Sequence, residues 1–272
     1  MFAPAKKEHI ALKLAISGAS GSGKTMSALR LARGLVGENG RIAVVDTENG
    51  SASLYSDRIK FDVCNVAPRE YQYNGGRQAM KSFNAADFAN AVNAAISAKY
   101  DVLIIDSASH AWEATLDAKT RLDAGGGNSF TNWGAAGNLW KNVVNAILQA
   151  PIPVIACFRS KTEYVLETSE TGKIVPRKFG LAPIARDGSE FEFTTWFDID
   201  RQHIASTSKD RTGLFAEPAI ITEETGETFV RWLKTLDGKS EHEDKSPIHW
   251  APQNVTVGTP TGDALEKVGF NV

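Results

Sequence analysis

The sequence predicts an α/β fold with a mostly parallel sheet and helices on both faces. The first observation is a set of short apolar runs with the Val/Ile content of buried strands, at 11–17, 41–48, 101–107 and 152–158. The second is a set of segments between them with apolar residues at helical spacing, at 24–36, 84–97 and 133–150. Continuous apolar strands alternating with helices are typical of a parallel sheet covered on both sides.

The pattern changes after Phe158, where antiparallel strands are expected to extend the sheet. Segment 162–180 resembles a hairpin with Thr-Gly at its turn, and 201–209 can pair beside 191–200. In 191–200 the alternation places four apolar side chains on one face: Phe191, Phe193, Phe197 and Ile199. Segment 222–236 is predicted to be a short final helix. The polar, Pro- and Gly-rich residues 237–272 are expected to form a mostly disordered tail after one domain, 1–236.

The composition is that of an ordinary globular protein. Of 272 residues, 42% are hydrophobic and 23% charged, and the net charge of −2 gives no global basic field. Any nucleic-acid surface must therefore be local. Cys64 and Cys157 lie far apart with no metal-ligand spacing, which indicates buried thiols in a reducing compartment. Without a long apolar run or a signal-peptide pattern, we expect a cytoplasmic protein with no membrane partner.

One motif carries the chemistry. "GASGSGKT" at 18–25 fits the phosphate-binding pattern G-x-x-x-x-G-K-[ST] between a strand and a helix. The glycines permit a tight loop whose N–H groups point inward, and Lys24 can reach the β- and γ-phosphate oxygens. The Thr25 hydroxyl can ligate Mg²⁺. The predicted ligands are therefore ATP and Mg²⁺, and the predicted nucleotide-binding residues are Gly18, Ala19, Ser20, Gly21, Ser22, Gly23, Lys24, Thr25 and Met26.

Two acidic residues complete the predicted catalytic set of Lys24, Glu48 and Asp106. Asp106 ends the buried run "DVLIIDS", where a carboxylate can hold a water on Mg²⁺; its alternative is an N-cap or turn residue. Because Ser107 follows it, the position for a catalytic Glu directly after this Asp is empty. Glu48, in "VVDTEN", lies 24 positions after Lys24 and can orient and deprotonate the attacking water. Its alternative is a surface-loop Glu.

Over about residues 10–236 these motifs resemble the RecA/RadA/KaiC/DnaB group of ATPases. "VVDTEN" is similar to the strand that ends in that group's catalytic Glu, and "LIIDS" to its Walker B strand. "PVIACFRSK" occupies the place of the γ-phosphate sensor strand, with Arg159 and Ser160 as candidates where RecA has Gln. "IDSASHAWE", "FRSKTEYV" and "PRKFGLAPIARDGSEFEFTTWFDID" resemble phage-encoded ATPases of the Sak type. That resemblance implies phage recombination or single-strand annealing, with a single-strand-binding protein as a further partner.

The stretch "SKDRTGLF" at 208–215 also takes its meaning from this resemblance. A lone K-x-R is most often a solvated turn. In KaiC, RadA and DnaB the same pattern reaches into the neighbouring subunit's nucleotide site. The resemblance therefore implies that Lys209 and Arg211, on one face of one strand, act in trans within a homo-oligomer with nucleotide at its subunit interfaces.

RecA-like proteins bind DNA through the loops after the Walker B and sensor strands, here about 107–132 and 159–190. Within the second, 171–186 contains a candidate surface for single-stranded DNA: Lys173, Arg177, Lys178, Phe179 and Arg186. Within the first, a glycine run precedes Phe130 and Trp133, which can contact bases. The alternatives are a subunit interface and packed aromatics. For His110 and Trp112, a hydrogen-bonded His and a packed Trp are favoured over a catalytic pair.

Two rival functions remain open. In one, ATP drives oligomerisation or partner binding with negligible turnover. The other is a small-molecule kinase, but the sequence has no acceptor-pocket pattern or Arg-rich lid segment.

Overall fold

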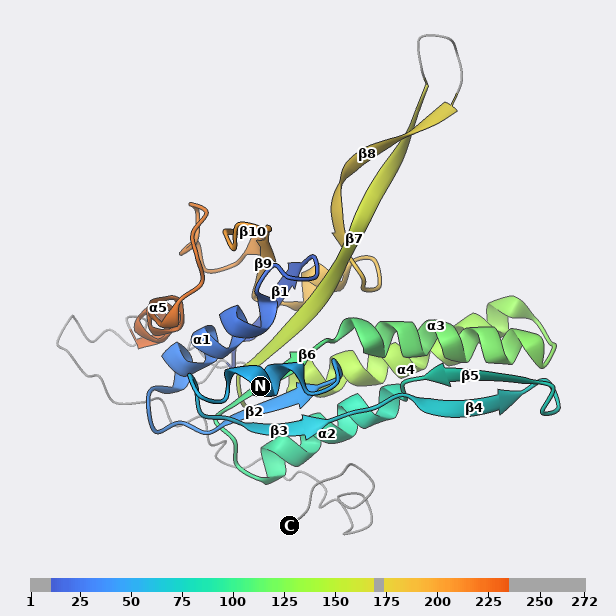
Figure 1. The fold of residues 1–272 in the computed structure, drawn as a ribbon, viewed down its shortest axis with the longest axis horizontal. Coiled ribbons are helices and arrows are strands. Elements are labelled where there is room, and N and C mark those ends of the chain that lie inside the picture. Colours follow the sequence, from blue (N-terminus) through green and yellow to red (C-terminus); the bar gives the residue numbers. More distant parts are fainter. Residues whose placement is uncertain (1–10, 169–173, 235–272) are drawn as a thin grey trace, which may run out of the picture.

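The computed structural model describes residues 11–168 and 174–234 (Figure 1). The strands are β1 Lys13–Gly18, β2 Ile42–Asp46, β3 Asp62–Asn65, β4 Arg69–Tyr73, β5 Gln78–Ser82, β6 Val102–Asp106, β7 Val154–Thr168, β8 Ile174–Pro183, β9 Thr195–Ile199 and β10 Ala205–Asp210. The helices are α1 Lys24–Val36, η1 Ser51–Tyr55, α2 Ala85–Ser97, α3 Ser109–Ala124, α4 Ser129–Gln149, η2 Ser189–Glu192 and α5 Glu223–Lys234, where η marks 3₁₀ turns. The expected tail at 237–272 lies outside the described residues.

The central sheet has the order β10-β9-β1-β7-β6-β2-β3, and β8 pairs with β7. Its inner pairings are parallel, whereas β10 runs antiparallel to β9 and β8 antiparallel to β7. Strands β1, β2 and β6 are buried along their whole length, as continuous apolar runs require. The expected α/β fold with antiparallel additions is confirmed.

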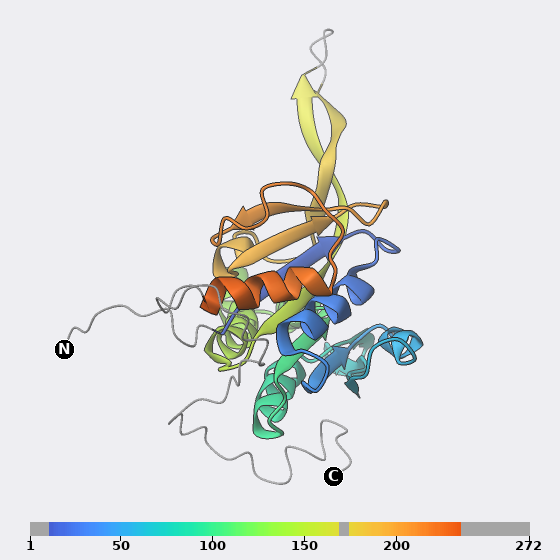
Figure 2. The same cartoon turned by 90° about the vertical axis from the view of Figure 1, so that its left-hand side faces the viewer.

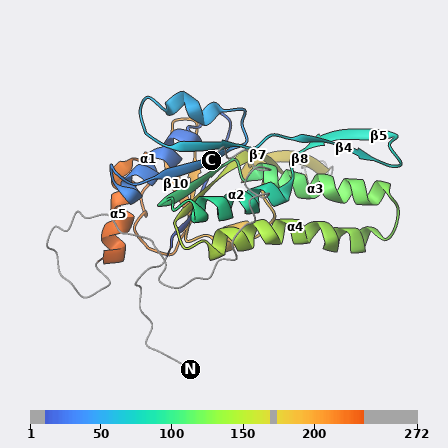
Figure 3. The ribbon, with the colours of Figure 1, turned by 90° about the horizontal axis from the view of Figure 1, so that it is seen from below.

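The helices form two groups on opposite faces of this sheet. From β1 the chain passes through α1 to β2, which lies beyond β7 and β6 in the sheet. After β3 it returns toward β1, through α2 to β6 and then through α3 and α4 to β7. Because such crossovers are right-handed, the reversal places α1 on one face and the other three helices on the opposite one (Figures 2 and 3). The reversal leaves a switch point at the carboxyl end of β1, where ligands bind in sheets of this kind.

Helix α5 packs directly on α1, and its bounds agree with the predicted final helix. The two backbones approach closely at Gly34 and Gly226, since a Cβ at Gly226 would lie 2.4 Å from the Leu31 carbonyl oxygen. An ion pair of 2.8 Å between Arg30 and Glu223 bridges the same two helices. This contact joins the end of the described chain to the helix that begins at the phosphate-binding loop.

Strands β7 and β8 form a hairpin that projects from the body of the molecule (Figure 1). The predicted hairpin at 162–180 is confirmed for its described part, while the expected Thr-Gly turn at 171–172 lies outside the described residues. The hairpin separates from the sheet near Ser160, which pairs with Pro183. Its root therefore lies beside the carboxyl ends of the central strands.

Three local expectations are wrong. The expected loop at 107–132 is largely helix, because α3 begins at Ser109 and α4 at Ser129. A second hairpin, β4–β5, forms where no strands were expected. Phe191 does not share a strand face with Phe193 and Phe197: it lies in η2 and is 67% exposed. Strand β9 starts only at Thr195 and is buried on both faces, so simple alternation does not describe it.

Candidate nucleotide-binding site

The glycine loop lies at the carboxyl end of β1 and leads into α1. Gly21 and Gly23 have φ values of 79° and 90°, in the left-handed region that favours glycine. Gly18 leaves no room for a side chain, because a Cβ there would lie 2.7 Å from the Ile199 carbonyl oxygen. Lys24 is buried at the start of α1, and its Nζ donates to the Ala19 carbonyl at 3.0 Å. The loop thus has the form that the motif predicts.

Asp106 faces Thr25 across the end of the sheet. The Thr25 hydroxyl donates to Oδ2 of Asp106 at 2.6 Å. Oδ1 of Asp106 is buried and has no hydrogen-bond partner among the described residues. Burial raises the pKa of Asp106 to about 6; the Thr25 hydrogen bond opposes this rise and the Glu48 charge adds to it. A hydroxyl and an unpartnered carboxylate oxygen are ligands that Mg²⁺ accepts, so these two residues fit a Mg²⁺ ion.

Glu48 follows β2, the strand next to Asp106 in the sheet. Asp46 pairs with Asp106 in the β2–β6 register. The Asp46 carboxylate accepts hydrogen bonds from the backbone N–H of Glu48 at 2.6 Å and of Ala52 at 2.8 Å. This fixes the turn that presents Glu48, which is half-buried. Glu48 follows Asp46 by two residues, so it lies at the same edge of the sheet as Asp106.

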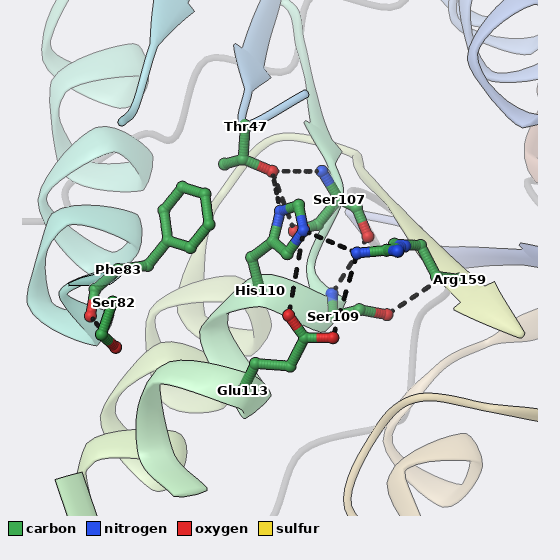
Figure 4. A network of polar contacts seen from close by, with 8 residues as sticks. All are labelled: Thr47, Ser82, Phe83, Ser107, Ser109, His110, Glu113 and Arg159. Atoms are coloured by element: carbon green, nitrogen blue, oxygen red, sulfur yellow. Dashed lines mark hydrogen bonds and ion pairs between the residues drawn. The ribbon is translucent and has the colours of Figure 1, made fainter. Parts of the chain in front are cut away.

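Of the two sensor candidates, Arg159 lies at the level of the glycine loop, because it pairs with Gly18 in the β1–β7 register. Its Nη1 lies 2.9 Å from Nε2 of His110 and 4.0 Å from Oε1 of Glu113 (Figure 4). Ser160 is half-buried at the hairpin root. Arg159 thus lies at the same edge of the sheet as Lys24, Glu48 and Asp106.

The favoured interpretation of His110 and Trp112 agrees with their surroundings. His110 is buried, hydrogen-bonded to Thr47 and Arg159, and stacked on Phe83 at 4.5 Å between ring centroids. Trp112 packs against Trp140, with ring centroids 5.6 Å apart.

His203 was not anticipated from the sequence. It lies in the β9–β10 turn with a φ of 65°, and its Nδ1 is 2.9 Å from the Ser22 carbonyl oxygen. A Cβ at Gly23 would lie 2.9 Å from the same ring atom. The imidazole therefore supports the outer side of the glycine loop. No local pattern indicates this contact, because His203 and Ser22 are distant in the sequence.

Lys209 and Arg211 lie away from the glycine loop of their own chain. Lys209 pairs with Trp196 near the start of β9, whereas the loop follows the opposite end of β1. The two cations were expected on alternate residues of one strand, which is wrong: β10 has an irregular register before Lys209 and ends at Asp210. They still share a surface, because both donate to carbonyl oxygens of η2, at 2.7 Å from Lys209 to Glu190 and at 2.8 Å from Arg211 to Phe191.

The candidate DNA contacts lie on the hairpin and its flanks. Arg177, Lys178 and Phe179 belong to β8, and Arg186 is exposed just beyond that strand. Lys173 lies outside the described residues. The other candidates do not lie in the loop expected after the Walker B strand: Phe130 and Trp133 belong to the first turns of α4, which Asn128 caps. Phe130 is 85% exposed, whereas Trp133 is partly packed against Trp112.

A family model described as "AAA domain" matches residues 10–237, which is most of the chain. No curated protein matches the sequence. Across 11–168 and 174–234, none of the helices has the length and apolar character needed to cross a membrane. The match spans the glycine loop with Lys24 and Thr25, Asp106 and every strand of the central sheet. The chain therefore belongs to the AAA-domain family of P-loop ATPases.

Proposed function

We propose that this protein is a Mg²⁺-dependent ATPase of RecA-like layout in which Glu48 activates the attacking water. The observation that carries this proposal is the position of Glu48 just beyond the carboxyl end of β2, two residues after Asp46, which pairs with Asp106. Lys24 and Thr25 approach the same edge from α1. A base placed beside the phosphate site can orient a water for in-line attack.

The neighbouring polar groups are committed to other contacts. Asp46 is buried, and each of its carboxylate oxygens accepts a hydrogen bond from a backbone N–H. The Glu113 carboxylate faces Arg159 and His110. Ser107 is fully buried. Among the carboxylates described around Asp106, Glu48 is therefore the best candidate for the base.

Each residue at this edge has a proposed role. Lys24 binds the β- and γ-phosphate oxygens, and the backbone N–H groups of the loop hold the β-phosphate. Thr25 and Asp106 would hold Mg²⁺, which neutralises charge on the phosphates when bound. Glu48 accepts a proton from the water as the water attacks.

Substitution of Glu48 by Gln tests this proposal against the rival of a binding module with little turnover. Glu48→Gln should retain ATP binding and lose phosphate release, because the amide keeps the shape of the side chain but is not a base. Lys24→Ala should lose both. Phosphate release by Glu48→Gln equal to that of the wild type would exclude Glu48 as the base.

We extend the proposal to an assembly that acts on single-stranded DNA in phage recombination or annealing. Support for subunit-to-subunit action comes from Lys209 and Arg211, which lie far from their own glycine loop and so suit a neighbour's site. Support for DNA contact comes from the projecting β7–β8 hairpin, whose β8 strand contains Arg177 and Lys178. A projecting strand with two adjacent cations can contact the phosphates of a single strand.

A further inference from the structure

A buried polar network joins the carboxyl ends of β2, β6 and β7 (Figure 4). Thr47 immediately follows β2, and its Oγ1 accepts a hydrogen bond from the backbone N–H of Ser107 at 2.8 Å. His110, in the first turn of α3, places Nδ1 2.7 Å from the same oxygen. On the other side of the ring, Nε2 of His110 is 2.9 Å from Nη1 of Arg159. One imidazole thus lies between two segments that border the nucleotide site.

The hydrogen-bond donors fix the protonation of this ring. An arginine has donors only, so Nε2 of His110 must accept from Arg159 and lacks a proton. The ring proton is then on Nδ1 and donates to Thr47. Thr47 Oγ1 accepts from His110 and Ser107, which uses both of its acceptor sites, and its own hydrogen faces the Ser107 carbonyl at 3.4 Å. A doubly protonated His110 would lose the Arg159 contact.

The surroundings of His110 favour this neutral form. Its side chain is about 10% exposed, and the Phe83 ring covers one face with an interplanar angle of 13°. Arg159 and Glu113 are the charged groups that face it, with Glu113 Oε2 at 3.9 Å from Nε2. Burial, and next the Arg159 charge, lower the pKa of His110 to about 4. At neutral pH the His110 ring is therefore uncharged, and it links Thr47 to Arg159.

The network is directly connected to Glu48 and Asp106, the two acidic residues of the proposed reaction. Thr47 directly precedes Glu48, and its backbone N–H donates to the Asp106 carbonyl at 2.8 Å. Arg159 lies at the hairpin root, where its carbonyl accepts from the Ile184 N–H at 2.6 Å. The Arg159 N–H in turn donates to the Ser109 hydroxyl at 2.9 Å, at the start of the helix that contains His110.

We infer that His110 is a positioning residue, whose Nδ1–H holds Thr47 and thereby Glu48, and whose Nε2 holds Arg159 beside the hairpin. The inference rests on the proposed role of Glu48 as the base. His110 touches neither the water nor the nucleotide in this scheme. It sets the geometry of the turn from which Glu48 acts, and a displacement of about 1 Å there would cost roughly 100-fold in rate.

Two substitutions test the contacts of the two ring nitrogens of His110 separately. In His110→Asn the side-chain NH₂ occupies the position of Nδ1, so Thr47 keeps a donor and Arg159 loses its acceptor. In His110→Gln the longer side chain can present oxygen to Arg159, but Thr47 loses its donor. We expect His110→Gln to lower kcat for ATP hydrolysis by about 100-fold with little change in KM, and His110→Asn to recover most of the activity.

Threonine variants supply a matched control. Thr47→Val should reproduce the loss of kcat and Thr47→Ser should restore it, because Ser retains the hydroxyl. Thr115 is also a buried threonine, but its hydroxyl donates to the Ala111 carbonyl within α3. Thr115→Val should therefore change the unfolding midpoint without changing kcat. The three variants to compare are His110→Gln, Thr47→Val and Thr115→Val. If all three lose activity, each in proportion to its loss of stability, the positioning role is overturned.

The ¹⁵N shifts of the His110 ring give a readout independent of turnover. At pH 7 they should show protonated Nδ1 and unprotonated Nε2; the opposite tautomer or an imidazolium would overturn the inference. If Glu48→Gln is inactive and His110→Gln is fully active, only the positioning role fails. If Glu48→Gln hydrolyses ATP like the wild type, the proposed function fails, and the positioning role fails with it.

Discussion

At the scale of single residues, Asp106 shows how the site is kept ready for a cation at the expense of stability. Its carboxylate is buried with one unpartnered oxygen, and burial raises its pKa to about 6. A raised pKa means that the folded protein binds this proton more tightly than the unfolded chain. The resulting stabilisation is complete below the ordinary pKa of 3.8 and is lost as the pH rises through about 6.

Replacing Asp106 by Asn should therefore stabilise the nucleotide-free protein at neutral pH while abolishing ATP hydrolysis. The neutral amide removes the cost of a buried charge, which is at most about 3 kcal/mol for a shift of this size. Thermal unfolding of both proteins between pH 4 and 8 measures the effect. The advantage of Asp106→Asn should be large at pH 8 and shrink toward pH 4. An advantage that does not depend on pH would contradict this account of Asp106.

At the scale of elements, the contact between α1 and α5 depends on two glycines. Gly226 has no space for a Cβ, which would lie 2.6 Å from the Leu35 nitrogen as well as close to the Leu31 carbonyl. Gly226→Ala should separate the helices and lower the free energy of unfolding by about 1–3 kcal/mol or more. Chemical unfolding measures this loss.

A glycine in α4 provides the matched control for that substitution. Gly137 is also helical, but a Cβ there would meet nothing within 4 Å. Gly137→Ala should stabilise the protein by up to about 1 kcal/mol, because alanine loses less backbone entropy in a helix. If both substitutions raised the unfolding midpoint, helix propensity rather than close packing would govern Gly226.

The β7–β8 hairpin is the element on which the DNA proposal is tested. Substitution of both Arg177 and Lys178 by Gln should weaken binding of single-stranded DNA and make its salt dependence shallower by about 1.4 in log–log slope, at 0.7 per phosphate contact. Lys99→Gln with Lys141→Gln removes the same charge from exposed positions on the body and should leave the slope unchanged. Identical slopes for both double variants would remove the hairpin from the DNA interface.

At the scale of the whole molecule, the features that could be predicted from the sequence are those with a local sequence pattern. Strands β1, β2, β6 and β7 have continuous apolar runs, and the glycine loop has a motif, so both could be predicted. The β4–β5 hairpin could not, because its strands "REYQY" and "QAMKS" are polar and half-exposed. Contacts such as His203 with Ser22, or Thr47 with His110, join distant segments and depend on the strand order.

The strand order also makes the proposed assembly testable. Because Lys209 and Arg211 lie at the end of the sheet away from their own glycine loop, they cannot serve that loop without rearrangement. In a head-to-tail assembly they can face the site of the next subunit. A chain with Arg211→Ala and a chain with Lys24→Ala should each be nearly inactive.

Mixing the two chains should restore activity in part. With random, equal mixing, about one quarter of head-to-tail interfaces pair an intact Lys24 with an intact Arg211 on its neighbour. The expected ATP hydrolysis is therefore up to about a quarter of the wild-type value, measured after co-assembly is verified by size. As a control, a mixture of Lys24→Ala with Asp106→Asn should stay inactive, because both changes affect the same side of the interface. Verified co-assembly without recovery would show that the two cations do not act on the neighbouring subunit's nucleotide and serve only their contacts with η2.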